Sequence, residues 1–231
     1  MKIFYAILCL LGFISIGFAQ DGEISLDSLD TSYKEDQFYL GITYNLLAKM
    51  PDNMSQNGFS SGFHFGFIKD MPINKRRNWA IGLGLGYSTN SVNQNLQIIE
   101  EANKTYSYQL LTSSEFSKNK FSQHLIEVPL EIRWRTSTTT DYKFWRIYSG
   151  FKIGYLIASS TKFKNTNELI KLKNIESFNK VQYGLTLGIG YDSWNAYMYY
   201  ALNSVFEDGA ALNGQPLDVK MVKIGIMFYI L

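Results

Sequence analysis

The sequence has a single cysteine, little charge, and no long apolar run beyond its first twenty residues. Only 18% of its 231 residues are charged, and the formal net charge is +2. This balance excludes a dedicated nucleic-acid binder, because no basic excess is available to displace counterions from phosphates. The missing apolar run of about 18 residues excludes a helical membrane protein. A membrane β-barrel stays open, since its alternating strands average to near-neutral mean hydropathy, here −0.11.

The composition is otherwise that of a folded chain of about one domain. Aromatic residues make up 16% and apolar residues 46% of the sequence, whereas disordered chains have few aromatics and much charge. The length fits one ordinary domain or at most two small ones.

The first twenty residues have the pattern of a secretory signal peptide. Lys2 precedes an apolar run, and Gly17 and Ala19 are the small residues expected before a cleavage site. We predict cleavage after Ala19; an uncleaved anchor helix is the alternative, disfavoured by the acidic residues that follow at once. Cys9 lies inside the apolar run. The mature chain is therefore expected to have no thiol, which excludes disulfides, cysteine catalysis and thiolate metal sites.

Acidic residues gather directly after the predicted signal peptide. Only Lys34 opposes them, and the stretch has no apolar periodicity, so we expect a solvated tail. We divide the chain into a signal peptide (1–19), an acidic periplasmic tail (20–36) and a barrel (37–231). The acids of the tail are Asp21, Glu23, Asp27, Asp30, Glu35 and Asp36.

From Phe38 onward, apolar residues alternate with other residues in eight successive runs. Such alternation is typical of β-strands with one apolar face. Most runs have the roughly nine or more residues that a tilted strand needs to cross a bilayer, whereas soluble strands usually have about five or six. The runs cover residues 38–46, 59–67, 79–87, 126–134, 145–157, 181–191, 194–206 and 222–230.

The connections between these runs are short and long in turn. Residues 69–78, 136–144 and 192–193 form the short joins, and residues 48–58, 88–123, 159–179 and 207–218 form the longer ones. This alternation is typical of an outer-membrane barrel with short periplasmic turns, and an even strand number places both termini in the periplasm. The sequence thus predicts an all-β protein, an eight-stranded antiparallel up-and-down transmembrane β-barrel in the outer membrane.

The face opposite the apolar series carries glycines and charges. Glycine there makes room for long side chains in the crowded lumen of a small barrel. We expect the inward charges to form a paired network, because an unpaired buried charge is costly. A lumen filled in this way leaves no continuous pore, so transport through it is not expected. The predicted network consists of Glu127, Glu131, Arg133, Arg146, Lys152 and Lys223.

Two further patterns support the membrane interpretation. All four tryptophans fall on the outer face beside short joins, as an aromatic girdle at one interface requires: Trp79, Trp134, Trp145 and Trp194. The last run resembles the carboxy-terminal pattern that the barrel-assembly machinery recognises, through Lys223, Gly225, Phe228 and Ile230.

The sequence predicts no catalytic, cofactor-binding or metal site. His64 is expected inside the barrel and His124 at the start of the fourth strand, without the spacing of a metal site. The Gly82-x-Gly84-x-Gly86 spacing is that of a strand rather than a dinucleotide loop. A Ser–His–acid site on the outer loops, built from Ser122, His124 and Glu115, remains as an alternative.

Four segments resemble the PorT family, called SprT in gliding bacteria: residues 66–74, 124–137, 142–148 and 178–186. The Glu127-Val-Pro-Leu130 core is shared with a wider group of outer-membrane barrels, whereas residues 133–136 and 142–146 point more specifically to the PorT family. The resemblance implies a non-enzymatic outer-membrane component required for type IX secretion, and for gliding where present. The implied partners are outer-membrane lipid, other type IX secretion components and, during biogenesis, the barrel-assembly machinery. Residues 136–143, flanked by Arg133, Arg135 and Arg146, are the first candidate contact surface.

Two other classes of function remain open at this point. One is an outer-membrane barrel of unrelated role, such as a lipid-modifying enzyme or an adhesion or binding barrel. The other is a soluble lipocalin-like binder, against which the outward apolar faces and the tryptophans count.

Overall fold

The computed structural model describes residues 36–136 and 145–230 of the chain. The predicted signal peptide, residues 20–35 of the acidic tail, and residues 137–144 of the second short join lie outside the described residues. Within the described part, no helix is long and apolar enough to cross a membrane.

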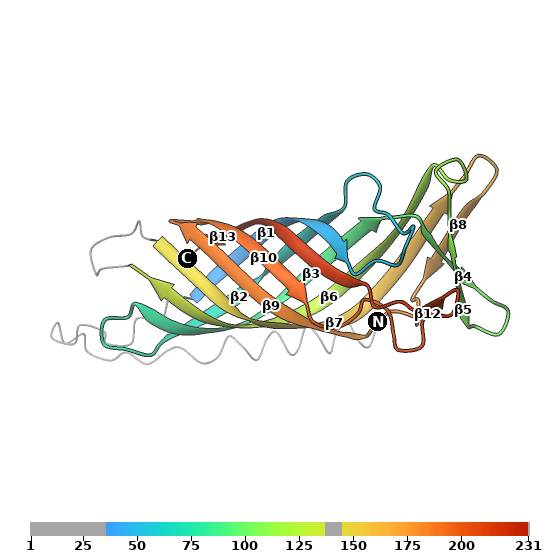
Figure 1. Cartoon of the computed structure of the whole chain (residues 1–231). Coiled ribbons are helices and arrows are strands. Elements are labelled where there is room, and N and C mark those ends of the chain that lie inside the picture. The colour runs from blue at the N-terminus through green and yellow to red at the C-terminus, as the bar shows by residue number, and fades with distance from the viewer. Residues whose placement is uncertain (1–35, 137–144, 231) are drawn as a thin grey trace, which may run out of the picture. The chain divides into compact units, whose positions relative to one another are not determined.

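Eight strands form a closed antiparallel ring, as predicted (Figure 1). Each strand pairs with its neighbours in the chain, and the first strand pairs with the last, placing Phe38 opposite Ile230. The cyclic order is β1–β2–β3–β6–β7–β9–β10–β13. Their bounds are β1 Asp36–Ala48, β2 Ser61–Pro72, β3 Trp79–Asn93, β6 Lys118–Arg135, β7 Trp145–Lys164, β9 Val181–Tyr191, β10 Trp194–Ala201 and β13 Lys220–Ile230.

The outer wall of the ring is apolar and the interior is polar. Because successive side chains in a strand point to opposite faces, the alternating runs put their apolar residues outside. Phe38 is 62% exposed and Leu85 61%, whereas the neighbouring Gln37 is fully buried. An apolar belt of this extent is far larger than a soluble monomer exposes, and it matches the lipid-facing band of a membrane barrel. A lipocalin-like barrel would have the reverse arrangement.

Several strands run further than the apolar pattern indicates. The stretch 88–123, expected to be a loop, contains the end of β3, a hairpin of β4 (Leu96–Glu100) and β5 (Tyr106–Leu110), and the start of β6. His124 therefore lies within β6 rather than at its start. The apolar series ended early because the strands continue with polar outward residues such as Ser91 and Lys120.

A register shift marks the point where β7 leaves the apolar belt. His124 pairs with Ala158 but Leu125 pairs with Leu156, so Ile157 has no partner of its own on β6. Such a bulge reverses which side chains of a strand face outward. Odd-numbered residues of β7 face outward up to Ile157, and even-numbered residues do so from Ala158. The strand thereby continues to Lys164, where sequence alone suggested a loop.

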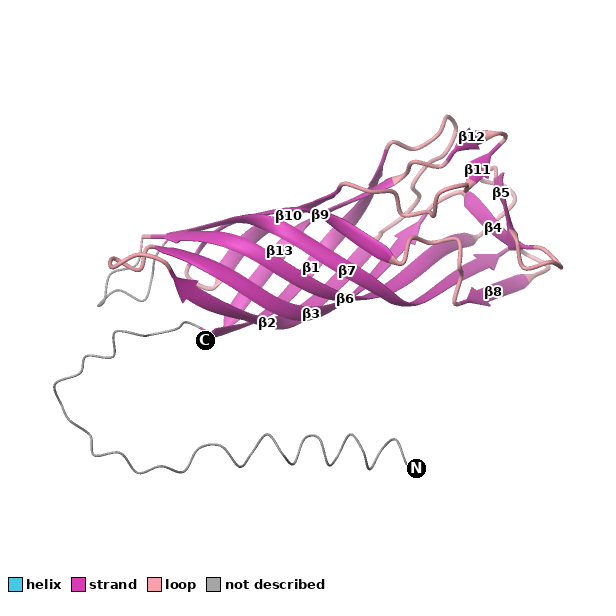
Figure 2. Ribbon diagram, turned by 90° about the horizontal axis from the view of Figure 1, so that it is seen from below, coloured by secondary structure: helices cyan, strands magenta, loops and turns pink. Residues whose placement is uncertain are grey.

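Beyond this end of the ring, the long connections fold into a cap, which we define as residues 49–60, 94–117, 165–180 and 202–219. Figure 2 shows its short strands gathered at one end: β4, β5, β8 (Leu169–Lys173), β11 (Ala211–Leu212) and β12 (Gln215–Pro216). Phe178 and Phe206 of the cap pack against Phe121 of β6, with ring centroids 5.3 and 6.5 Å from that of Phe121. All three side chains are buried. The long connections are thus an ordered structure with its own apolar core.

Candidate functional site

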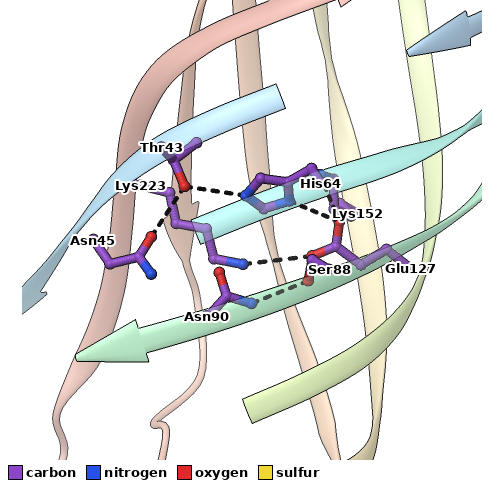
Figure 3. Close-up of polar contacts among 8 residues, drawn as sticks. All are labelled: Thr43, Asn45, His64, Ser88, Asn90, Glu127, Lys152 and Lys223. Carbon is purple, nitrogen blue, oxygen red and sulfur yellow. Dashed lines mark hydrogen bonds and ion pairs between the residues drawn. The ribbon is translucent and has the colours of Figure 1, made fainter. Parts of the chain in front are cut away.

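The most concentrated chemistry of the described chain lies inside the barrel, around the carboxylate of Glu127 (Figure 3). Its Oε1 accepts hydrogen bonds from Ser88 Oγ at 2.8 Å and Lys223 Nζ at 3.4 Å. Its Oε2 accepts one from Lys152 Nζ at 3.0 Å and lies 3.5 Å from His64 Nδ1. We call these five residues the Glu127 cluster.

The Glu127 cluster connects strands from all round the barrel. Glu127 is on β6 and Lys223 on β13, which stand opposite each other in the ring of eight, with three strands between them on either side. Inward parity places both side chains in the lumen, and each is less than 5% exposed. Each ammonium group is paired with an oxygen of the same carboxylate, which offsets part of the cost of removing the three groups from water.

A second group, the Arg133 cluster, lies nearer the short turns. The Arg133 guanidinium donates to Asp70 Oδ1 at 2.6 Å, Gln37 Oε1 at 3.0 Å and Glu131 Oε2 at 3.0 Å. Arg135 also reaches Asp70, with its Nη1 3.4 Å from Oδ2. A buried arginine suits this position because its planar fork can bond several acceptors at once.

The structure places all six predicted network residues inside the barrel and buried, Arg146 included. It also brings in partners that the sequence did not suggest. Asp70 was assigned to a short connection, but β2 continues to Pro72 and directs Asp70 inward. The available signal was that Asp70 has the same parity as the inward residues His64 and Ile68. His64 was expected inside, but its link to Glu127 depends on how the strands are staggered.

Tyrosine rings fill much of the remaining interior. The Arg133 guanidinium carbon lies 4.1 Å from the centre of the Tyr148 ring, and Lys152 Nζ lies 5.0 Å from that of Tyr197. A void of about 10 Å³ remains between the two clusters, beside Glu131 and Tyr229. That is at the lower limit for one water molecule. The two clusters and the tyrosine rings thus fill the described lumen at these levels.

One chain of contacts in the lumen has the order of a hydrolase triad. Thr43 Oγ1 lies 3.1 Å from His64 Nε2, whose other ring nitrogen faces Glu127. All three residues are at most 2% exposed, and Lys152 already engages the same carboxylate oxygen. A substrate cannot reach this hydroxyl, so the arrangement is structural.

The alternative site on the outer loops is not assembled. His124 Nδ1 lies 2.6 Å from the Tyr87 hydroxyl, and Ser122 Oγ donates to Ser91 at 3.3 Å. Glu115 instead accepts hydrogen bonds from the backbone N–H and hydroxyl of Thr112, which lower the pKa of its carboxyl below the ordinary range. Among residues 36–136 and 145–230, no group of three or more His, Cys, Asp or Glu side chains is placed to hold a metal ion.

The predicted tryptophans and two of the four predicted sorting residues lie on the outer surface. Trp79 pairs with Trp134 across β3 and β6, while Trp145 and Trp194 both lie opposite Tyr191. All four tryptophans face outward at the ends of strands that meet short turns. In β13, Phe228 and Ile230 face outward and Lys223 inward. A membrane interface at the tryptophans and a sorting role for β13 stay predictions.

A comparison with family models points to the same architecture. The family described as outer membrane protein beta-barrel domain matches residues 18–207. Ail, the attachment invasion locus protein of Yersinia pestis, is 12% identical, with 86% of this chain and 98% of Ail covered and a TM-score of 0.36. A mutant porin of Rh. blastica is 6% identical, with 86% and 100% covered and a TM-score of 0.22. Both likenesses are weak, and neither carries an argument about this chain. No curated protein is a significant match.

Proposed function

The chain belongs to the outer membrane protein beta-barrel domain family, and we propose that it acts in the outer membrane as a non-enzymatic scaffold for protein export by the type IX secretion system. In this role the barrel holds or helps to assemble the translocon without conducting substrate itself. Gliding motility also depends on this barrel in hosts that glide by means of the type IX secretion system.

The filled lumen is the observation that carries the scaffold proposal. Glu127 and Lys223 join opposite walls, and the Arg133 cluster blocks the interior a second time nearer the short turns. A barrel closed in this way contributes through its surfaces: the apolar belt, the cap, the short turns and the acidic tail. Long loops on a rigid scaffold are also where binding surfaces usually lie.

The resemblance to the PorT (SprT) family supplies the link to export. Two of the resembling segments, residues 66–74 and 124–137, meet inside the barrel through the pair of Asp70 and Arg133. The resemblance therefore includes residues that fill the lumen as well as turn residues. A third segment, 142–148, overlaps residues 136–143, which we propose as a contact surface for another component.

We propose that the short turns and both termini lie in the periplasm and that the cap lies outside the cell. Short periplasmic turns and long outer connections are the rule for bacterial barrels. In this orientation the acidic tail, residues 20–36, is available to periplasmic parts of the secretion machinery.

Deletion of the gene in a secreting, gliding host tests the proposal. We expect cargo with a carboxy-terminal secretion signal to accumulate inside the cell, and a wild-type copy to restore export. A His124→Ala copy should restore export equally, whereas an inserted but inactive H124A barrel would favour the lipid-modifying enzyme instead. Unchanged export in the deletion strain would leave a barrel of unrelated role.

Gentle crosslinking of purified membranes tests the scaffold mechanism separately. We expect other secretion components to co-isolate with the full-length barrel. A copy in which residues 137–143 are replaced by a Gly/Ser linker should insert normally and lose that association. If no secretion component is recovered even with the wild-type chain, the scaffold mechanism is wrong although a requirement for export could still hold.

A further inference from the structure

Six lysines occupy one face of a three-stranded sheet beside the cap. Where β6 and β7 pass beyond the apolar belt, β8 pairs with β7 in place of β9. Lys118 is opposite Lys164, and Lys120 is opposite Lys162. Lys162 is in turn opposite Lys171 of β8. With Lys173, two residues further along β8, these residues make up the lysine face: Lys118, Lys120, Lys162, Lys164, Lys171 and Lys173.

The lysine face is directed to the outside of the protein. On β6 and β7 the residues that alternate with the lysines, including Asn119, Phe121 and Phe163, are buried, whereas on β8 Leu172 is half-buried and Ile170 exposed. Side chains of one parity in a strand share one side of the sheet, so all six lysines project from the opposite side. Four of them are exposed, and Lys120 and Lys162 are partly so.

Acidic side chains among the described residues do not neutralise the charge of this face. None of the six lysines forms an ion pair with an acidic side chain in the described part of the chain; Lys120 Nζ donates to Ser91 Oγ at 3.3 Å. Directly opposed side chains in a sheet lie about 5 Å apart at Cβ, and like charges there destabilise the pairing. Lys120, Lys162 and Lys171 form such a row across three strands. An external polyanion would relieve this repulsion.

The position of the lysine face suggests which polyanion this is. Ile126, on the outer wall of β6, is among the last apolar residues before the polar extension. Lys120 lies six positions before Ile126 in the chain, which is about 20 Å away along the strand. At a strand tilt of about 40°, this places Lys120 about 15 Å above Ile126 along the membrane normal. The row of Ser122, Ser160 and Lys173 lies about 5 Å lower. Headgroup layers begin directly at the edge of the hydrocarbon core, and lysine stems extend toward them.

We propose that the lysine face binds the phosphate groups of lipids in the leaflet that surrounds the cap, which is the outer leaflet in the orientation proposed above. On β7 the exposed Ile157 extends the apolar wall to the level of His124 and Leu125. The flexible stems of the lowest lysines can therefore reach down to the phosphate headgroups. The binding would hold β6, β7 and β8 against the membrane surface and fix the position of the cap. It does not depend on any role in export, so the two proposals can fail separately.

Binding of diphosphoryl lipid A to the purified, folded mature chain in neutral detergent tests this proposal. The patch variant K120Q/K162Q/K171Q removes the central row, and K49Q/K75Q/K104Q removes three exposed lysines elsewhere as a charge-matched control. We expect wild type and control to bind alike and the patch variant to bind about tenfold to a hundredfold more weakly. Raising the salt concentration should weaken wild-type binding. Heat-modifiable mobility in gels checks that each variant is folded.

Three further probes distinguish the source of the anion. Dephosphorylated lipid A should bind wild type and patch variant equally weakly, and inorganic phosphate should not compete at millimolar concentration. Dextran sulfate represents a soluble polyanion. Equal lipid A binding by the patch variant and wild type would overturn the proposal. Stronger binding of dextran sulfate than of lipid A would also overturn it, and would identify the face as a site for soluble polysaccharide.

Discussion

The ion pair between Glu127 and Lys223 joins opposite walls of the barrel, with Oε1 and Nζ 3.4 Å apart. Most contacts in a barrel connect neighbouring strands, whereas this pair crosses the diameter of the ring. Lys152 reaches the other oxygen of the same carboxylate, so one acidic side chain pairs with two lysines in the interior.

Replacing Glu127 should therefore destabilise the barrel. We expect E127Q to lower the free energy of unfolding by about 3–5 kcal/mol, because it leaves two buried ammonium groups without a carboxylate. Urea titration in lipid vesicles, followed by heat-modifiable mobility, measures the change. The exposed Glu176 provides the matched control, and E176Q should have little effect. The triple variant E127M/K152M/K223M should recover most of the loss, whereas failure to recover would point to a packing defect instead.

The barrel was predictable from the sequence because one physical rule governs every residue of its wall. A side chain faces either lipid or lumen, so parity alone placed Glu127, Lys152 and Lys223 inside. Their mutual contacts were not predictable, because they depend on the stagger between strands that are far apart in sequence. Asp70 was missed for a related reason: polar residues near the turn concealed the continuation of β2.

The cap could not be predicted by that rule. Its aromatic core forms where Phe178 and Phe206, from two separate cap segments, meet Phe121 of β6, and these three residues share no period that marks them as neighbours. The strand extensions were hidden because their outward residues are polar, and the bulge at Ile157 broke the parity of β7. Contacts of this kind join residues that are far apart in the sequence, so they can be predicted only once the fold is known.

A pair of inward glycines tests how tightly the lumen is packed. A Cβ on Gly225 would lie 2.6 Å from Thr43 Cα and still closer to the Ile42 carbonyl oxygen, so backbone would have to move. A Cβ on Gly188 would find its nearest atom, Tyr148 Cβ, at 3.7 Å, an ordinary contact. We expect G225A to cost about 1–3 kcal/mol of stability and G188A to be close to neutral. Equal effects in the urea titration would contradict this view of the interior.

Truncating an aromatic side chain in the core of the cap should loosen the cap while the barrel stays folded. Phe206 packs against Phe178 with centroids 5.5 Å apart, and both rings are buried. Truncation of a buried phenylalanine to alanine typically costs about 3–5 kcal/mol. We expect F206A to accelerate limited proteolysis within the cap without changing the heat-modifiable mobility of the barrel, and F206L to do so much less. Loss of the mobility shift in F206A would show that cap and barrel fold as one unit.

Single cysteines test the orientation on which the lipid proposal depends. The mature chain is expected to have no cysteine, so A102C in the cap and K75C in the turn between β2 and β3 each introduce a unique thiol at an exposed position. A membrane-impermeant maleimide added to intact cells should label A102C, whereas K75C should react only after the outer membrane is opened. A periplasmic protein with a free thiol controls for leakage.

The reverse labelling would place the cap in the periplasm. It would move the lysine face to the inner leaflet, and it would remove residues 136–143 from reach of periplasmic partners. Because the lipid A measurement uses purified protein, it would still report whether the lysines bind phosphate, so an error in orientation can be separated from an error in chemistry.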